Sequence, residues 1–234
     1  MFIGHFAVGF ASKRIAPRAS LGVLMAAPNL LDLLWPVFLA AGWEQVRIDP
    51  GNTAFTPLDF VSYPISHSLV AACCWGALFA LLYWGRTRNG RGAIVIALAV
   101  VSHWLLDFVT HRPDLALYPG GPRVGLGLWN SVPGTVAVES VMYAVGMRIY
   151  LTTTRPRDRT GRYALWAFLA VMVVLYVGAF AGPPPPNTRA LTTTAFALWL
   201  IPLWAWWIDR HRELRQPAFH QKLTRDLRSD RTSV

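Results

Sequence analysis

Residues 93–111 read AIVIALAVVSHWLLDFVTH, an apolar run that contains His103 and Asp107 in its second half and ends at His111. Its length is close to the ~20 residues that a helix needs to cross the ~30 Å hydrocarbon layer of a bilayer. Because the apolar residues are continuous and do not alternate with polar ones, the run predicts a membrane helix and not a strand. A spacing of four residues places His103 and Asp107 on one face of that helix.

Apolar segments of similar length recur along the chain. The 234 residues are 54% hydrophobic and 15% charged, whereas an ordinary globular domain has roughly 25% charged residues. The sequence predicts an all-α polytopic membrane helical bundle with an N-terminal half-span and about six transmembrane helices, at residues 21–41, 66–84, 93–110, 133–151, 163–181 and 194–208. Pro28 and Pro36 predict a kink or a break in the first of these spans.

The first 14 residues do not have the pattern of a signal peptide, because their positive charges follow the apolar stretch. They predict a half-span or an interfacial helix. Cys73 and Cys74 are adjacent within a predicted span. They are expected to be small apolar filler and to form neither a disulfide nor a zinc site built from cysteines.

The charges predict an orientation in the membrane. The formal net charge is +10, and most basic residues lie in alternate loops, near residues 13–18, 86–91 and 155–162, and in the tail from residue 210. The remaining loops contain only Arg47, Arg112, Arg123 and Arg189. By the positive-inside rule, both termini are expected in the cytoplasm. The positive charge is thus a signal of topology, and no nucleic-acid partner is expected.

Ionisable residues within the predicted spans are expensive, at ~2.5–3.5 kcal/mol each on insertion scales, and indicate function. Counted at 1.5 Å per helical residue from the cytosolic charges, they lie about 12–28 Å into the membrane. They are expected to form one polar cluster that opens to the outer side. The members of this cluster are His5, Asp32, His67, His103, Asp107 and Glu139.

Imidazole and carboxylate groups together favour zinc or a similar divalent ion. Structural alternatives remain for each residue. His103 and Asp107 could form a hydrogen bond between spans, and Asp32 could bind backbone donors freed by a helix break. His67 could cap a helix start, Glu139 could pair with a histidine, and His5 could lie at the membrane interface. These alternatives do not explain the common depth.

The ordered motifs resemble those of a family of bacterial inner-membrane-associated metal-dependent hydrolases, one member of which is described as LexA-binding. The resemblance covers roughly residues 1–150, and the family is distantly similar to zinc-dependent phospholipase C. It is carried by Gly4–His5, Asp32 in a proline-containing span, PISHS at 64–68, SHWLLDFVTH at 102–111, GLGLWNS at 125–131 and then Glu139. Three parts of the chain are expected: a metal-site region at 1–150, two further spans at 151–208 and a basic cytosolic tail at 209–234.

The resemblance implies that His5, Asp32, His67, His103 and Asp107 are metal ligands, with Glu139 a ligand or a general base. Thr135 stands where the phospholipase pattern has a second histidine, so one or two ions, most readily zinc, are expected and not three.

An expected mechanism follows. Water activated by the metal attacks an ester phosphorus or carbonyl, Asp107 or Glu139 takes the proton, and His111, at the outer mouth, protonates the leaving group. Asn130 either binds a substrate oxygen or caps the following helix. A site that opens to the outer leaflet suits an amphiphilic or lipid ester as substrate.

Two other classes of function use the same features. A transporter could relay protons or cations through these residues, although it would commonly show an inverted repeat, and none is visible. A membrane scaffold could recruit acidic partners with its basic tail, and its buried polar residues would then tolerate alanine.

Overall fold

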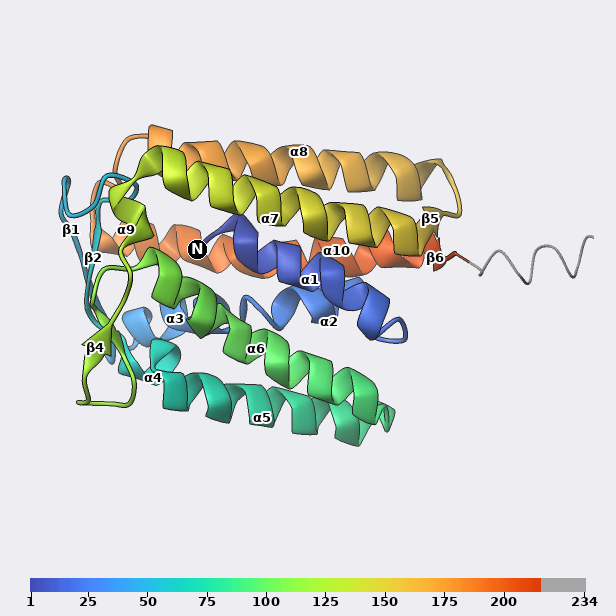
Figure 1. The fold of residues 1–234 in the computed structure, drawn as a ribbon, viewed down its shortest axis with the longest axis horizontal. Coiled ribbons are helices and arrows are strands. Elements are labelled where there is room, and N and C mark those ends of the chain that lie inside the picture. Colours follow the sequence, from blue (N-terminus) through green and yellow to red (C-terminus); the bar gives the residue numbers. More distant parts are fainter. Residues whose placement is uncertain (216–234) are drawn as a thin grey trace, which may run out of the picture.

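The computed structural model of the protein describes residues 1–215, and within them most of the chain is helical. The long helices run side by side along the longest axis of the molecule (Figure 1). They are α5 (Leu69–Thr87), α6 (Gly90–Thr110), α7 (Val132–Thr153) and α8 (Arg159–Ala181). Three consecutive elements form one further continuous helical stretch: α9 (Thr188–Ala195), the 3₁₀ turn η2 (Phe196–Trp199) and α10 (Leu200–Arg210).

Within the described part of the chain, four helical stretches are long and apolar enough to cross a membrane. They are α5, α6, α8 and the stretch from Thr188 to Arg210. Helix α7 has 22 residues but is not one of the four, and it contains Glu139 and Arg148 among its apolar residues. The expected number of six spans therefore stays a prediction.

The predicted span at 21–41 is broken into α2 (Leu21–Ala26) and α3 (Leu30–Ala40). Pro28 lies in the break, as expected from its missing N–H, and Pro36 lies inside α3. The break matters for the site, because it frees the Pro28 carbonyl and begins a new helix whose first turn contains Asp32.

Helix α1 (Ile3–Ile15) lies in the interior of the bundle and packs against α7, α2 and α6. The expectation of an interfacial helix is wrong, because His5 and Phe10 are fully buried. The close approach to α7 depends on Gly146, since a Cβ added there would lie 2.4 Å from the carbonyl oxygen of Ala7. The short helix is apolar on most of its surface, so neighbouring helices can cover it on several sides.

Two short hairpins lie at one end of the bundle, which we call the hairpin end (Figure 1). Strand β1 (Gln45–Ile48) pairs antiparallel with β2 (Leu58–Ser62), and β3 (Leu115–Ala116) pairs with β4 (Arg123–Val124). The opposite end, which we call the basic end, contains the antiparallel pair β5 (Thr154–Pro156) and β6 (Arg212–Leu214). These strands have two to five residues and join helices, so they modify the all-α expectation only in the connections.

Strand β6 is formed by residues at the start of the expected basic tail at 209–234. Residues 216–234, including His220, lie outside the described residues.

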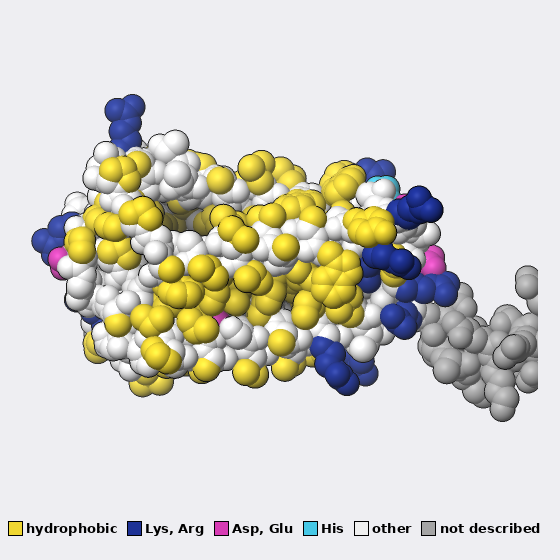
Figure 2. Space-filling model, turned by 90° about the horizontal axis from the view of Figure 1, so that it is seen from above, with side chains coloured by type: hydrophobic (Ala, Val, Ile, Leu, Met, Phe, Trp, Pro, Cys, Tyr) yellow, Lys and Arg dark blue, Asp and Glu magenta, His cyan; other side chains and the backbone are white. Residues whose placement is uncertain are grey.

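Figure 2 shows apolar side chains along the middle of one face and lysine and arginine side chains toward the ends. Large apolar residues on the long helices are solvent-exposed without a membrane, for example Leu81, Leu82 and Val174 at 63–69%. The free thiols of Cys73 and Cys74 lie on an exposed part of α5. This distribution is typical of a protein whose middle zone contacts lipid.

Candidate metal centre

Four helices bring the five predicted metal ligands together inside the bundle. Helix α1 contributes His5, and α3 contributes Asp32 from its first turn. His67 is the last residue of the short helix α4 (Pro64–His67), which begins at a proline. Helix α6 contributes His103 and Asp107 from one face. Ligands that are up to 102 residues apart in sequence thus meet at one point.

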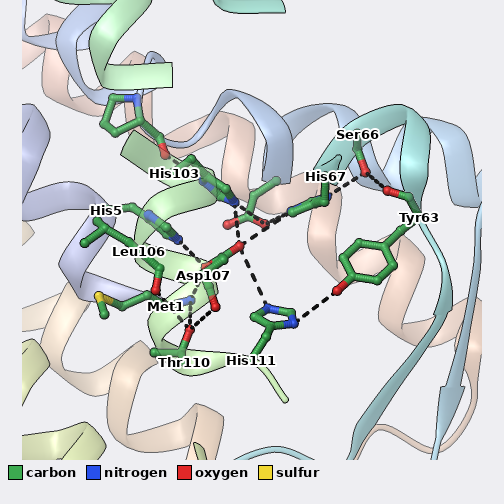
Figure 3. A network of polar contacts seen from close by, with 12 residues as sticks. Met1, His5, Tyr63, Ser66, His67, His103, Leu106, Asp107, Thr110 and His111 are labelled. Atoms are coloured by element: carbon green, nitrogen blue, oxygen red, sulfur yellow. Dashed lines mark hydrogen bonds and ion pairs between the residues drawn. The ribbon is translucent and has the colours of Figure 1, made fainter. Parts of the chain in front are cut away.

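The carboxylate of Asp107 lies at the centre of this group (Figure 3). The Nε2 atoms of His5 and His103 are 3.1 and 3.0 Å from its two oxygens. The Nε2 atoms of His67 and His111 are 4.0 and 3.8 Å away. Four imidazole rings therefore direct the same nitrogen atom toward one carboxylate.

Asp32 adds a second carboxylate on the other side of His103. Its Oδ1 atom is 3.4 Å from His67 Nε2 and 3.8 Å from His103 Nε2. Two sets of three potential ligand atoms result, each within 4.8 Å: His5, His103 and Asp107, and Asp32, His67 and His103. Ligand atoms around one tetrahedral zinc ion are about 3.3 Å apart, and the nitrogen–oxygen distances of 3.0–3.8 Å within the two sets are close to this value.

The group is buried apart from one side chain. His5, His67, His103 and Asp107 are at most 4% exposed. The side chain of Asp32, in contrast, is 28% exposed. Asp32 is therefore the member of the group that lies nearest to the protein surface.

Contacts on the far side of each ring determine which nitrogen of the histidine faces the centre. His103 Nδ1 lies 2.7 Å from the carbonyl oxygen of Pro28, which can only accept a hydrogen bond, so Nδ1 carries the proton. In the neutral ring the lone pair of His103 then lies on Nε2, a buried atom that is 3.0 Å from Asp107 Oδ2 but forms no hydrogen bond of normal geometry in the described structure. Donation from the other ring nitrogen to a backbone carbonyl is typical of a metal-ligating histidine, and Nε2 is then free to bind an ion.

His67 is oriented in the same way by Ser66 and Glu44, which are not among the predicted site residues. Ser66 Oγ donates to Glu44 Oε2 at 2.6 Å, and Ser66 N donates to Glu44 Oε1 at 2.7 Å. The hydroxyl proton of Ser66 is already donated to Glu44. In the 2.6 Å contact between Ser66 Oγ and His67 Nδ1, Nδ1 must therefore be the donor and Oγ the acceptor. The lone pair on His67 Nε2 therefore faces Asp32.

Ser68, and not His67, caps the following helix. Its side chain accepts a hydrogen bond from Ala71 N at 3.2 Å, at the start of α5. The alternative that His67 serves as a helix cap is therefore wrong.

His111 is buried and does not lie at an open mouth. Its Nδ1 atom is 2.9 Å from Asp114 Oδ1, which leaves Nε2 facing Asp107. Tyr63 also donates to Asp114 Oδ1, at 2.6 Å. Burial and the charge of Asp114 raise the pKa of Tyr63 well above its ordinary value, so the phenol keeps the proton that it donates. The expected outward position of His111 is thus corrected, while its role as an acid stays a prediction.

Glu139 lies next to the group but belongs to neither set of three ligands. Its Oε2 atom accepts hydrogen bonds from Phe2 N and Gly4 N, at 2.8 and 3.0 Å, at the start of α1. The Oε1 atom is buried and has no partner in the described residues. Glu139 thus stabilises the start of the helix that positions His5, and one of its oxygens remains available.

Asn130 is exposed in the 3₁₀ turn η1 (Leu128–Asn130) and does not cap α7. Ser131 does so, because its hydroxyl accepts from Gly134 N at 3.1 Å. The capping alternative is wrong, and substrate binding by Asn130 stays a prediction.

Comparison with known proteins gives one match. The sequence model of a family described as YdjM inner membrane protein matches residues 1–182, a range that contains every predicted ligand. No curated protein matches the chain, and no solved structure matches it. The match supports the bacterial inner-membrane part of the resemblance, while the hydrolase activity and the link to LexA binding stay predictions.

Proposed function

We propose that this chain, which belongs to the YdjM family of inner membrane proteins, is a membrane-embedded, metal-dependent hydrolase. Its substrate is a phosphoester or other ester of an amphiphilic molecule, and its centre opens toward the outer side of the bacterial inner membrane. Both termini lie in the cytoplasm, and about six helices cross the bilayer.

The observation that carries this proposal is the common orientation of the buried histidines. His67, His103 and His111 each direct Nδ1 at an acceptor outside the centre and Nε2 at a carboxylate inside it. A helix-packing contact needs no such agreement among three rings, whereas a metal site does. His103 belongs to both ligand sets, so one or two ions fit.

A bound divalent ion, most readily zinc, supplies a Lewis acid and lowers the pKa of water. The chain supplies the ligands His5, Asp32, His67, His103 and Asp107. The burial of these groups excludes bulk water and strengthens electrostatic interactions with the substrate.

Two further groups are placed to hold or move a proton. His111 Nε2, at 3.8 Å from Asp107 Oδ2, is close enough to exchange a proton with it after a small shift. Glu139 Oε1 is an uncommitted acceptor beside the centre.

The first experiment measures metal content and hydrolysis of the purified protein in nanodiscs. His103→Ala and Asp107→Ala are expected to lose bound zinc, the rise in unfolding temperature that zinc causes, and hydrolysis of a chromogenic phosphodiester. His211→Ala is the matched control, because His211 contacts Asp158 at the basic end and should leave all three unchanged.

Wild-type metal content in His103→Ala, or undiminished hydrolysis by metal-free protein, would contradict the proposal. Cation or proton flux into liposomes without metal-dependent hydrolysis would instead support the transporter class.

A further inference from the structure

Three of the four arginines in the predicted outer loops line a single cavity at the hairpin end. The cavity has a volume of about 440 Å³ and lies between the β1–β2 hairpin and the segment that follows α6. Arg47 comes from β1, Arg112 follows α6, and Arg123 begins β4. The positive-inside rule disfavours arginine on the outer side, so their convergence from three separate segments needs a local reason.

Ion pairs within the protein account for only part of this charge. Arg47 Nη2 lies 2.6 Å from Asp59 Oδ2, and Arg112 Nη2 donates to Asp59 Oδ1. Arg112 Nε also lies 3.5 Å from Asp114 Oδ2. Arg47 and Arg112 thus pair with the two carboxylates of the cavity, and the third arginine of the lining leaves one positive charge in excess.

Arg123 is the residue that carries the excess charge. It forms no ion pair with any residue in the range 1–215, and its one hydrogen bond through the side chain there is from Nη2 to the Val61 carbonyl, at 3.1 Å. It lines the 440 Å³ cavity and also an adjoining one of about 230 Å³. Most of its five N–H donors therefore remain available to a ligand.

The cavity is connected to the candidate metal centre through two side chains. Asp114 lines the cavity and binds His111 Nδ1 at 2.9 Å, and His111 Nε2 is 3.8 Å from Asp107. Asp114 and His111 would thus separate an anion held by Arg123 from the metal ligands, and the anion would lie on the predicted outer side of them.

We propose that this arginine-lined cavity binds a phosphate group of the substrate. Arginine presents a planar fork of donors that matches phosphate oxygens, and the free charge on Arg123 provides the anchor. This inference rests on the proposed function for the identity of the substrate but predicts a binding event that needs neither metal nor hydrolysis.

The test measures binding of inorganic phosphate by calorimetry to protein in neutral-lipid nanodiscs after chelation of metal, so that phosphate cannot bind at the metal centre. Arg123→Gln is expected to weaken binding at least about tenfold, the effect of losing a charge-assisted contact. Arg189→Gln is the matched control, because Arg189 is also a predicted outer arginine but does not line this cavity. Unfolding temperatures of both variants verify that the fold is retained.

A second arm identifies the source of the phosphate. Nanodiscs with phosphatidylglycerol are compared with phosphatidylcholine discs. If soluble phosphate binds and Arg123→Gln weakens it, the cavity takes a free or water-exposed phosphate. If Arg123→Gln leaves the binding of soluble phosphate unchanged but lowers the amount of phosphatidylglycerol that stays bound to the protein, the phosphate belongs to a lipid headgroup.

Binding that is equal in wild type and Arg123→Gln under both conditions, or absent from both, overturns the cavity proposal. Arg123-dependent phosphate binding in a protein that hydrolyses no ester would instead refute the hydrolase and leave the cavity standing. Ester hydrolysis without any Arg123-dependent phosphate binding would refute the cavity proposal and leave the proposed hydrolase standing.

Discussion

Ser66 and Ser68 flank His67 and have different tasks. Ser66 Oγ accepts from His67 Nδ1 and so directs Nε2 at Asp32, whereas Ser68 caps α5. Ser66→Ala is expected to lower zinc affinity roughly 10–100-fold, as for other contacts that orient a metal-ligating histidine. Zinc binding in competition with a chromophoric chelator measures this.

Ser68→Ala is the matched control for that prediction. Loss of the helix cap should cost about 1 kcal/mol of stability and leave zinc affinity close to that of the wild type. Equal zinc affinity in Ser66→Ala and wild type would refute the orienting role of Ser66, and Glu44→Gln should give a smaller loss than Ser66→Ala, because an amide oxygen still accepts the hydroxyl proton.

The residues that meet at the centre could be chosen from sequence because each is costly at membrane depth. Asp32 and His103 lie in apolar runs, where burying an ionisable group in the membrane costs free energy and therefore indicates a function. Glu44 gave no such signal, since a glutamate in a predicted loop is expected to be solvated. Its burial at 2% exposure depends on the tertiary position of Ser66, which no local pattern encodes.

At the scale of elements, α1 and α7 approach each other closely at Gly146. Gly146→Ala would place a Cβ 2.4 Å from a backbone oxygen of Ala7, so the two helices must separate. We expect a lower unfolding temperature and weaker zinc binding, because α1 carries His5. Thermal unfolding with and without zinc measures both effects.

Gly178→Ala in α8 is the control, since no atom lies within 4 Å of the added Cβ. Alanine favours a helix over glycine by about 1 kcal/mol, so this variant should be as stable as the wild type or more stable. A Gly146→Ala protein with unchanged stability and zinc affinity would show that the helices do not need this close contact.

The elements themselves were partly predictable. The apolar runs gave the positions of α5, α6, α7 and α8, and Pro28 gave the break between α2 and α3. The interior place of α1 was not predictable, because a short helix that is apolar on most sides suits both an interface and a core. The hairpins β1–β2 and β3–β4 were missed, since their strands are too short for an alternating pattern to stand out.

At the scale of the whole molecule, the charge pattern predicts that the hairpin end faces outward and the basic end faces the cytoplasm. In a Cys73→Ser, Cys74→Ser background, Asp49→Cys at the hairpin end should react with a membrane-impermeant maleimide in right-side-out spheroplasts. Arg86→Cys at the basic end should react only after permeabilisation. The reverse labelling pattern would invert the proposed orientation and would place the opening of the metal centre on the cytoplasmic side.

The interior position of α1 has a consequence for the order of events during synthesis. This helix is made before α7, yet its 13 residues are too few to cross a bilayer alone, and α7, its main packing partner, ends at Thr153. Until the ribosome has produced that residue, α1 lacks part of the surface against which it packs, and His5 is not held next to Asp107. Assembly of the complete centre is therefore a late event in biogenesis, and a nascent chain that stalls before α7 should lack the ligand set that contains His5 and should bind metal more weakly than the full chain.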